Sequence, residues 1–568
     1  MQPLVSPVTQ TVPAAIGEAA GGGGGGFPTP MFAASLKSSL VPETATGSST
    51  PTFTRATAAT VTDFEGLVKP VISGESRFAG ARRVRNLLAG PTNTLATEVV
   101  TVVSGSSYRV SFSGTGTITL SGASTLSLAG TSGQRSAIAT FAASSTSLTV
   151  TVSGSVTSAM VEDVTGQANQ NPSEYVSNGV LSAPFHGANV DGVKYFTTKN
   201  GNTVAANIVT EATGAAIGAS DYRADADGPF GYVSELARTN SWRFSQAFTD
   251  ATWVKTNCTV TTPSVASPSG APTVDAVNVA VGADALVAVS QNITVVTAQT
   301  WVSSFYVKAG AWNFIQLAAG TKFGTTDYVN FNLSTGAVAS TNMVAGKYGI
   351  QAFPNGWYRV WSVNATNGAG TSSVFPCFMA TDIASRAPTV PRPSAVTVAY
   401  IWGAQAELGT NSAHTSYIPT TGAAVSRNAD TLLYAGAGNI ASAAGTLKYT
   451  TSYTSSTQAG ISGPVLMISG TFALLGLSTL ADHFQAFTPD FITAISPAGV
   501  SAYDSPQWGI TTWGAEFKVA REGVGYGTPV AYSSFVVGDF YVGYSNTTAS
   551  WVNGTVRNIE IYDTENVA

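Results

Sequence analysis

Charged side chains are scarce in this sequence of 568 residues. Lys, Arg, Asp and Glu together make up 10% of the chain, whereas they make up roughly 25% of an average soluble domain. Hydrophobic residues make up 44%, an ordinary share, so glycine and small polar residues replace the missing charges. This composition favours β-structure with many tight turns, and it argues against helical bundles, coiled coils and charge-rich disordered chains.

Basic clusters are missing as well. The 26 Lys and Arg residues against 31 Asp and Glu residues give a formal net charge of -5. The densest basic group is Arg82, Arg83 and Arg85, which we interpret as a solvated loop near the start of a module. A protein that binds nucleic acid by neutralising phosphates needs clustered Lys and Arg, so no nucleic-acid partner is expected.

Cysteines and long apolar runs are also rare. Cys258 and Cys377 match no metal-ligand spacing and are too few for a disulfide framework, so we expect reduced, buried thiols. No apolar run approaches the ~18 residues of a membrane span. The first basic residue is Lys37, so the N-terminus lacks the basic region of a secretory signal. The sequence therefore predicts no membrane insertion, no export by the usual route, and assembly in a reducing cytoplasm.

Catalytic and metal-binding patterns are equally sparse. The three histidines, His186, His414 and His483, have no zinc-ligand spacing. Asp482 precedes His483, but neighbours in a strand point to opposite faces, and the sequence contains no Gly-x-Ser-x-Gly motif. We therefore predict no catalytic residue, no bound metal and no cofactor.

One acidic cluster leaves two alternatives open. Asp221, Asp225, Asp227 and Glu235 could supply the pair of carboxylates of a glycoside hydrolase, or they could bind calcium. An EF-hand is excluded, because the twelfth position counted from Asp225 is Leu236 and not Glu. We favour a solvated turn over both alternatives.

Much of the remaining sequence has the alternation of β-strands. Between Val99 and Val161 only Arg109 and Arg135 are charged, and apolar residues alternate with polar ones between Gly-rich turns. This period of two predicts antiparallel strands with one buried face, arranged as a small sandwich. An Asn-Gly turn signal and further strands are expected later in the chain, the turn at 354–356 and the strands at 302–307, 329–333, 358–363 and 396–402.

Two of the predicted sandwiches resemble each other in sequence. Both open with an Ala-Arg pair followed by an Asn, and both close with a Glu and then a segment that contains Tyr. The matching segments are 81–86 with 237–240, 159–162 with 404–407, and 172–176 with 415–419. They predict two related modules, at residues 81–177 and 237–428.

The N-terminal part differs from the rest. Residues 1–50 include the run of six glycines Gly21–Gly26, which imposes no conformation and is costly to order. We interpret residues 1–50 as an extended segment that anchors the chain to a larger assembly, and we expect their deletion to leave a cooperatively melting protein. The expected fold is all-β, with antiparallel β-sandwich (jelly-roll) modules in series after this anchor. The predicted ranges are 1–50 for the anchor, 51–80 for a short β connector, 81–177 for a small sandwich, 178–236 for a connector subdomain, 237–428 for a jelly roll and 429–568 for a last sandwich.

Several short motifs resemble those of tailed-bacteriophage proteins. The motifs TFTRAT, DFEGL and RF, at 52–57, 63–67 and 77–78, resemble the start of many tail-fibre and virion proteins. The motifs NGWYR, WGAQAE and SYIPT, at 355–359, 402–407 and 416–420, resemble those of a phage jelly-roll module related to carbohydrate-binding modules. The motifs NGTV and IEIY, at 553–556 and 559–562, resemble more loosely those of a concanavalin-like or laminin-G-like sandwich.

This resemblance implies a virion protein, and we expect a tail fibre that attaches to a glycan on the host surface without catalysis. One alternative is a head fibre or a capsid or tail decoration protein with a structural role. Another is a polysaccharide-degrading tailspike, although the sequence lacks the coil-by-coil repeat of the long β-helices that such tailspikes often resemble. The resemblance also implies other virion proteins as partners of the N-terminal segment, a host glycan or protein as receptor, and a homotrimer.

Aromatic residues supply the candidate glycan-binding site, because sugar rings stack on exposed Trp and Tyr side chains. Trp508, Trp513 and Trp312 lie in segments that we expect to be loops, and we take them as candidate glycan-binding residues. Core packing or a subunit contact is the competing interpretation for all three. The C-terminal sandwich, 429–568, is expected to make the host contact.

Overall fold

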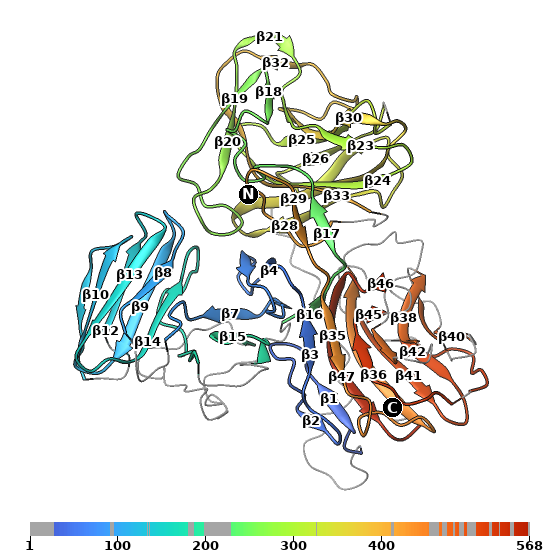
Figure 1. The fold of residues 1–568 in the computed structure, drawn as a ribbon. Coiled ribbons are helices and arrows are strands. Elements are labelled where there is room, and N and C mark those ends of the chain that lie inside the picture. The colour runs from blue at the N-terminus through green and yellow to red at the C-terminus, as the bar shows by residue number, and fades with distance from the viewer. Residues whose placement is uncertain are drawn as a thin grey trace, which may run out of the picture.

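The computed structural model describes residues 28–90, 96–132, 135, 137–179, 187–197, 229–324, 326–409, 414–453, 465–468, 474–480, 483–487, 493–496, 507–521, 525–532, 534–545 and 550–565. Strands make up 48% of the structure and helix 1%. The helical part includes the 3₁₀ turn η5 (Pro354–Gly356), at the expected Asn-Gly turn. The expected all-β sandwich class is confirmed (Figure 1).

Two sheets that share one hydrophobic core form what we call the hub sandwich. Its first sheet has nine strands and runs in space as β2 (Thr44–Ala45), β1 (Phe32–Ala34), β47 (Gly554–Tyr562), β36 (Gly445–Tyr453), β41 (Gln507–Trp513), β42 (Lys518–Arg521) and β43 (Gly525–Tyr526), with β16 (Gly231–Ser234) beside β47 and β6 (Phe78–Ala79) beside β16. Its second sheet has seven strands and runs as β3 (Thr52–Thr54), β35 (Thr431–Tyr434), β44 (Phe540–Val542), β37 (Leu466–Ile468), β38 (Leu474–Leu480), β39 (His483–Phe487) and β40 (Thr493–Ile495).

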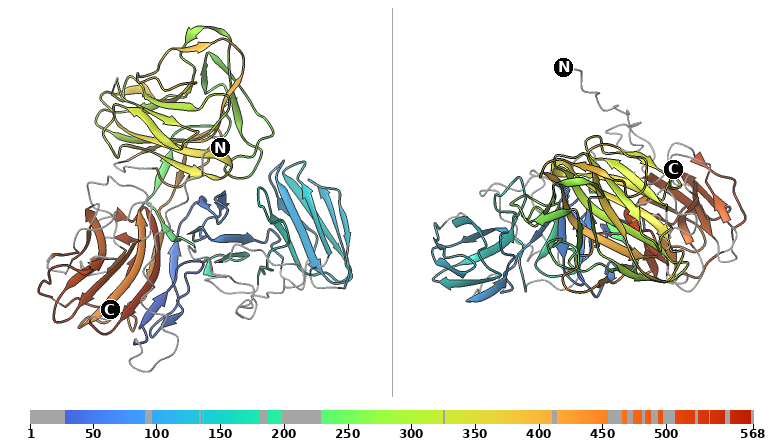
Figure 2. Two further views of the ribbon diagram at one scale, coloured as in Figure 1. Left: turned by 180° about the vertical axis from the view of Figure 1, so that it is seen from behind. Right: turned by 90° about the horizontal axis from the view of Figure 1, so that it is seen from above.

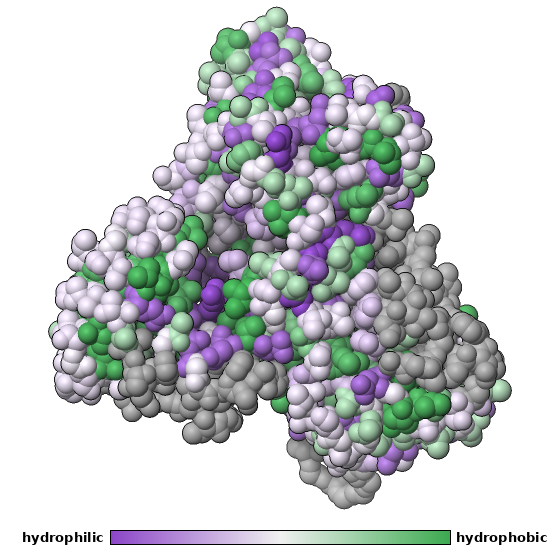
Figure 3. Space-filling view, in the orientation of Figure 1, coloured by the Kyte–Doolittle hydropathy of each residue, from purple (hydrophilic) through white to green (hydrophobic). Residues whose placement is uncertain are grey.

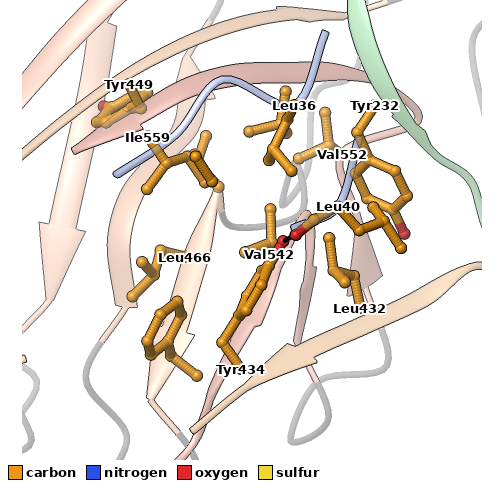
Figure 4. Close-up of a cluster of buried hydrophobic side chains, with 14 of the residues drawn as sticks. Leu36, Leu40, Tyr232, Leu432, Tyr434, Tyr449, Leu466, Val542, Val552 and Ile559 are labelled. Carbon is orange, nitrogen blue, oxygen red and sulfur yellow. Dashed lines mark hydrogen bonds between the residues drawn. The ribbon is translucent and has the colours of Figure 1, made fainter. Parts of the chain in front are cut away.

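Both ends of the described chain build the hub sandwich. β1 pairs with β47 so that Phe32 lies opposite Ile561, and β3 pairs with β35. Figure 4 shows Leu36 and Leu40 among side chains of the C-terminal strands, where the Tyr434 hydroxyl donates a hydrogen bond to the backbone oxygen of Leu40. The ring of Phe32 lies 4.9 Å from that of Tyr434, in an edge-on contact.

This pairing corrects the boundary that the sequence suggested at residue 50. Residues 32–45 are strands and core of the hub sandwich, whereas residues 1–27 lie outside the described residues. The range 429–568 is likewise incomplete as a sandwich, because β1, β3, β6 and β16 supply part of its two sheets. A local sequence pattern carries no signal for a partner strand several hundred residues away.

The small sandwich lies between residues 98 and 163 and has its own core. One of its sheets runs as β11 (Ser127–Ala129), β10 (Thr117–Gly122), β13 (Ser147–Ser153) and β8 (Glu98–Thr101), and the other as β12 (Ala137–Ala142), β9 (Ser107–Ser113) and β14 (Thr157–Asp163). Two strand pairs lie near the hub, β7 (Arg82–Arg85) with β15 (Val193–Phe196), and β4 (Ala59–Thr62) with β5 (Val68–Val71).

The large sandwich lies between residues 238 and 427 and also has its own core. Its first sheet runs as β19 (Cys258–Thr261), β20 (Asp275–Val279), β33 (Thr397–Leu408), β24 (Thr300–Ala309), β29 (Trp357–Ala365) and β28 (Tyr348–Phe353), with β17 (Arg238–Asn240) between β33 and β34 (Val425–Arg427). Its second sheet runs as β18 (Val254–Thr256), β22 (Ala288–Ser290), β31 (Val374–Met379), β25 (Phe314–Ala319), β26 (Tyr328–Asn332) and β27 (Ala337–Thr341). Three short strand pairs complete the structure: β21 (Gly282–Ala285) with β32 (Val390–Arg392), β23 (Ile293–Val295) with β30 (Gly370–Ser372), and β45 (Tyr544–Ser545) with β46 (Ser550–Trp551).

The three sandwiches lie around a centre rather than in a row (Figures 1 and 2). The small and the large sandwich are each inserted between strands of the hub sandwich, after β6 and after β16 respectively. They approach each other so closely at Gly166 and Gly270 that a Cβ on Gly166 would lie 2.5 Å from the Cα of Gly270. Only glycine fits this contact, and both residues have a positive φ (+72° and +87°).

The same asparagine seam closes both inserted sandwiches. In the small one, the Asn86 amide nitrogen donates to the backbone oxygens of Ala159 and Val176, at 3.1 and 3.0 Å. Its amide oxygen accepts from the backbone N–H groups of Leu88 and Val161. One side chain therefore joins the first segment of the module to its last strand and to the segment that leaves it.

Asn240 repeats this arrangement in the large sandwich. Its amide nitrogen donates to the backbone oxygens of Ala404 and Ile418, at 2.9 and 2.8 Å. Its amide oxygen accepts from the backbone N–H groups of Trp242 and Ala406. The same four hydrogen bonds therefore recur at matching positions of the two modules.

A buried arginine next to each seam strengthens the match. One terminal nitrogen of its guanidinium donates to a backbone oxygen of the closing segment, and the other donates to a serine hydroxyl on a central strand. The partners are Ser173 and Ser111 for Arg135, and Thr415 and Ser304 for Arg359.

The burial of the segment around β1 gives a test of its role. We expect Phe32→Ala to destabilise the hub sandwich by about 3–5 kcal/mol, because a fully buried phenyl ring leaves a cavity. Val41→Ala, in the same segment but at a 39% exposed side chain, is the control and should change stability by less than ~0.5 kcal/mol. Thermal denaturation of the full-length chain measures both. Equal melting of the two variants would show that this segment is an appendage and not part of the core.

Candidate functional site

Two of the three candidate glycan-binding residues belong to hydrophobic cores. Trp513 is 0% exposed, packs against Phe535, and donates its indole N–H to the backbone oxygen of Ala441 at 2.9 Å. Trp312 is buried in the core of the large sandwich. Neither ring has a free face on which a sugar could stack, so these two residues are corrected to core residues.

Trp508 is the candidate residue that remains on the surface, with 36% of its side chain exposed. It lies on β41, whereas the sequence suggested a loop. Because side chains alternate along a strand, Trp508 and Trp513 point to opposite faces of the sheet. Trp513 faces the core, and Trp508 therefore faces outward from the first sheet of the hub sandwich.

The neighbours of Trp508 on this outer face follow from the strand register. Thr450 on β36 lies directly opposite Trp508, and Lys448 lies opposite both Ile510 on β41 and Glu560 on β47. Residues that lie opposite each other share a face of the sheet. We call Trp508, Thr450, Lys448 and Glu560 the outer-face patch; Ile510 lies on the same face but is buried.

Charged groups and an aromatic ring are linked within this region. The Lys448 ammonium lies 5.3 Å from the centre of the Tyr562 ring, and the Tyr562 hydroxyl donates to Glu560 at 2.6 Å. Burial and this carboxylate raise the pKa of the Tyr562 hydroxyl, so it stays protonated and can donate. The exposed ring of Trp508, with Thr450 opposite it on a rigid sheet, is an arrangement that suits a sugar ring.

The acidic cluster does not support a hydrolase site. Asp221, Asp225 and Asp227 lie outside the described residues. Glu235 is described and is buried between two arginines, with Arg77 at 2.9 Å and Arg427 at 2.5 Å. Although burial would raise the pKa of Glu235, Arg427 and Arg77 lower it well below its usual range. A carboxylate held ionised in this way cannot serve as the proton donor of glycoside hydrolysis.

Glu235 belongs to a set of five buried charges that we call the junction cluster. Asp430 accepts hydrogen bonds from Arg55, at 2.9 Å, and from Arg77. Arg77 and Arg427 both contact Glu235. Arg55 and Arg77 flank the hub strands β3 and β6, whereas Glu235, Arg427 and Asp430 lie where the chain crosses between the hub and the large sandwich. The cluster therefore holds the two bodies at their shared boundary.

The basic group near residue 82 also differs from the sequence-based interpretation. Arg82, Arg83 and Arg85 lie on β7 and not in a solvated loop. Arg82 is buried and contacts Glu174, and Arg83 contacts Glu75 at 2.6 Å. Several of the few charged residues of this chain thus form buried ion pairs. In the sequence, the only sign of such a pair is a charged residue in an otherwise uncharged segment.

Histidine and cysteine side chains show no reactive arrangement among the described residues. His414 is buried, and burial together with Arg359 holds its pKa well below the usual value, whereas His186 and the side chain of His483 lie outside the described residues. Cys258 and Cys377 are buried free thiols, and burial raises the pKa of Cys258 to about 11. In the described ranges, no three His, Cys, Asp or Glu side chains come together as a metal site.

No family model matches the sequence, and no curated protein matches it either. The described part of the chain contains no helix long and apolar enough to span a membrane.

The junction cluster gives a test of what holds the bodies together. We expect Glu235→Ala to cost about 3–5 kcal/mol, because it leaves Arg77 and Arg427 buried without their shared carboxylate. Asp284→Ala, at an exposed carboxylate of the large sandwich, is the control and should stay within about 0.5 kcal/mol. Thermal denaturation reports both changes.

The pH dependence of this effect has a defined sign. A carboxyl group whose folded-state pKa is depressed stabilises the fold above its unfolded-state pKa, and that contribution is lost only as the pH falls towards the folded value. The pKa of Glu235 is depressed, so the difference in melting temperature between the native chain and Glu235→Ala should be the same at pH 7 and pH 5. A difference that disappears at pH 5 would contradict the assigned ion pairs.

Proposed function

We propose that this chain is a structural virion protein of a tailed bacteriophage, and that it attaches without catalysis to a glycan on the host surface. The observation that carries the proposal is Trp508, an exposed indole on the outer face of a sheet, with Thr450 beside it. A side chain that is fixed on a strand loses little conformational freedom when a ligand binds. The phage origin rests on the sequence motifs.

The position of these motifs supports a structural role. Arg55 and Arg77 lie in the motifs that resemble the start of virion proteins, and both are members of the junction cluster. Trp402 and Tyr417 lie in the motifs that resemble a phage jelly roll, and their rings pack 4.8 Å apart in a buried cluster. The resembling residues thus hold bodies and strands together, which is the function expected of motifs in a scaffold.

The arrangement of the bodies changes the expected path from virion to host. β41 lies in the same sheet as β1, with β47 and β36 between them. The chain before β1 therefore leads directly into the hub sandwich, which also carries the outer-face patch. We propose that residues 1–27 contact other virion proteins, and that the two inserted sandwiches act as side domains of the hub.

The assembled form is also part of the proposal. On the resemblance to tail fibres we propose a homotrimer located in the virion, with assembly in the host cytoplasm. Sedimentation of the full-length chain at micromolar concentration measures the oligomeric state, and a monomer would contradict this part of the proposal.

A substitution of Trp508 tests the attachment site. We expect Trp508→Ala to weaken binding of the purified protein to an array of bacterial surface polysaccharides several-fold, because loss of a stacking aromatic typically costs at least ~1 kcal/mol. Its melting temperature should change little, since the ring is already partly in solvent. Phe230→Ala removes another exposed aromatic ring of the chain and is the matched control.

The outcomes separate the alternatives. Binding by Trp508→Ala that equals that of Phe230→Ala would exclude the outer-face patch as the receptor site. The head-fibre or decoration role would be favoured by two results together: the native chain binds no polysaccharide, and Trp508→Ala is no longer incorporated into particles. Release of reducing sugar from a polysaccharide by the native protein would overturn the non-catalytic assignment.

A further inference from the structure

Two neighbouring valines are exposed at one end of the hub sandwich. Val536 and Val537, which lie shortly before β44, are 72% and 37% exposed. In the ranges that the structure describes, no other two consecutive large apolar side chains are both exposed. Figure 3 shows hydrophobic residues grouped on the lower part of the lower right body, which is the hub sandwich. Single exposed apolar side chains are ordinary on a protein surface, whereas grouped ones mark interaction sites.

The two valines belong to a set of three loops that pack on one another, which we call the loop platform. Its members are residues 46–50, 435–443 and 534–538. Gly436 approaches Gly538 so closely that a Cβ on Gly436 would overlap the backbone oxygen of Gly538. The buried side chain of Asn439 accepts a hydrogen bond from the backbone N–H of Gly47 at 2.9 Å and donates one to the backbone oxygen of Ser48 at 2.8 Å. These contacts hold the exposed valines on a fixed surface.

The loop platform contains no charged residue. Asp539 borders it, and there the carboxylate accepts a hydrogen bond from the backbone N–H of Gly436 at 3.3 Å. Copies of one chain that meet around a symmetry axis bring identical residues close together, and like charges at that place would repel each other. A surface of small uncharged residues with exposed valines avoids this repulsion, so it fits a second copy of this chain.

The chain enters the hub sandwich beside the loop platform. The backbone N–H of Thr46 donates to the backbone oxygen of Met31 at 2.9 Å, and Met31 directly precedes β1. Residues 1–27 therefore join the described chain close to this surface. Copies that meet at the loop platform bring their N-terminal segments together, which suits the proposed contacts of these segments with other virion proteins.

We propose that copies of this chain associate through the loop platform. The inference rests on the proposed homotrimer, whose subunit contact it locates. Val536 and Val537 of one copy pack against the loop platform of the next, and the apolar area that they bury favours association. Trp513, at one end of β41, donates its indole N–H to Ala441 of the loop platform, whereas Trp508 lies near the other end of that strand. Association therefore leaves the outer-face patch open.

Sedimentation of the full-length chain over a series of concentrations tests the proposal. We expect Val536→Asp to weaken association at least roughly tenfold, because identical carboxylates would meet where the copies touch. Val344→Asp is the matched control, since it places the same charge at a 76% exposed valine of the large sandwich, and it should associate as the native chain does. Native association of Val536→Asp would overturn the proposal.

A mixture of two variants shows whether position 536 of one copy meets the next copy. Val536→Lys alone should also associate at least roughly tenfold more weakly than the native chain. An equimolar mixture of Val536→Lys and Val536→Asp should associate more tightly than either variant, because an ammonium then meets a carboxylate. No recovery in a mixture of folded variants would overturn the proposal. Should either variant fail to fold, Val537→Ser carries the test and should weaken association several-fold.

The inference and the proposed function fail separately. An oligomer that neither Val536→Asp nor Val537→Ser weakens would overturn the role of the loop platform and leave the homotrimer standing. A native chain that sediments as a monomer would overturn both the loop platform and the homotrimer. Attachment to polysaccharide through Trp508 is measured by binding and stands or falls by its own result.

Discussion

The junction cluster is the constraint on which the arrangement of the three bodies depends. Arg55 and Arg77 come from the first part of the chain, Glu235 from the crossing between the hub and the large sandwich, and Arg427 and Asp430 from the return to the hub. A buried charge without its partner costs several kcal/mol, so all five groups are compensated only when every one of these segments is in place. Buried ion pairs add little net stability over apolar packing, and their value here is that they permit one arrangement of the crossings.

The asparagine seam explains how two large insertions fit into one sandwich. Asn86 and Asn240 each satisfy four backbone groups that belong to three different segments of a module. An amide has two donor hydrogens and an oxygen with two lone pairs, so each seam uses its full capacity. Because the first and last segments of a module are joined there, the chain enters and leaves at the same place and the hub strands on either side can pair.

Local alternation in the sequence was enough to predict strands and turns, but not their partners. The expected strand at 302–307 lies within β24, and Asn355 has the positive φ (+61°) that its turn requires. Trp508 and Trp513 show the limit: both follow turn-forming residues in the sequence, and only the partner strand β36 decides that the segment is a strand with one indole inside and one outside. The pairing of β1 with β47 left no local pattern, because register over such a distance is fixed by a shared core.

Insertion also determines which bonds carry a force through the molecule. The small and large sandwiches each have a core and a seam of their own, whereas the core of the hub needs both β1 and β47. The cost of closing such a long loop grows only logarithmically with its length, and folded modules inside the loop bring its ends closer. A pull on the segment before β1 is transmitted directly to β47 and the strands beside it. The force does not run through the inserted sandwiches, because the chain enters and leaves each of them at one seam and does not stretch it between its ends. The outer-face patch, which includes Trp508 on β41, therefore lies on the sheet that carries the force.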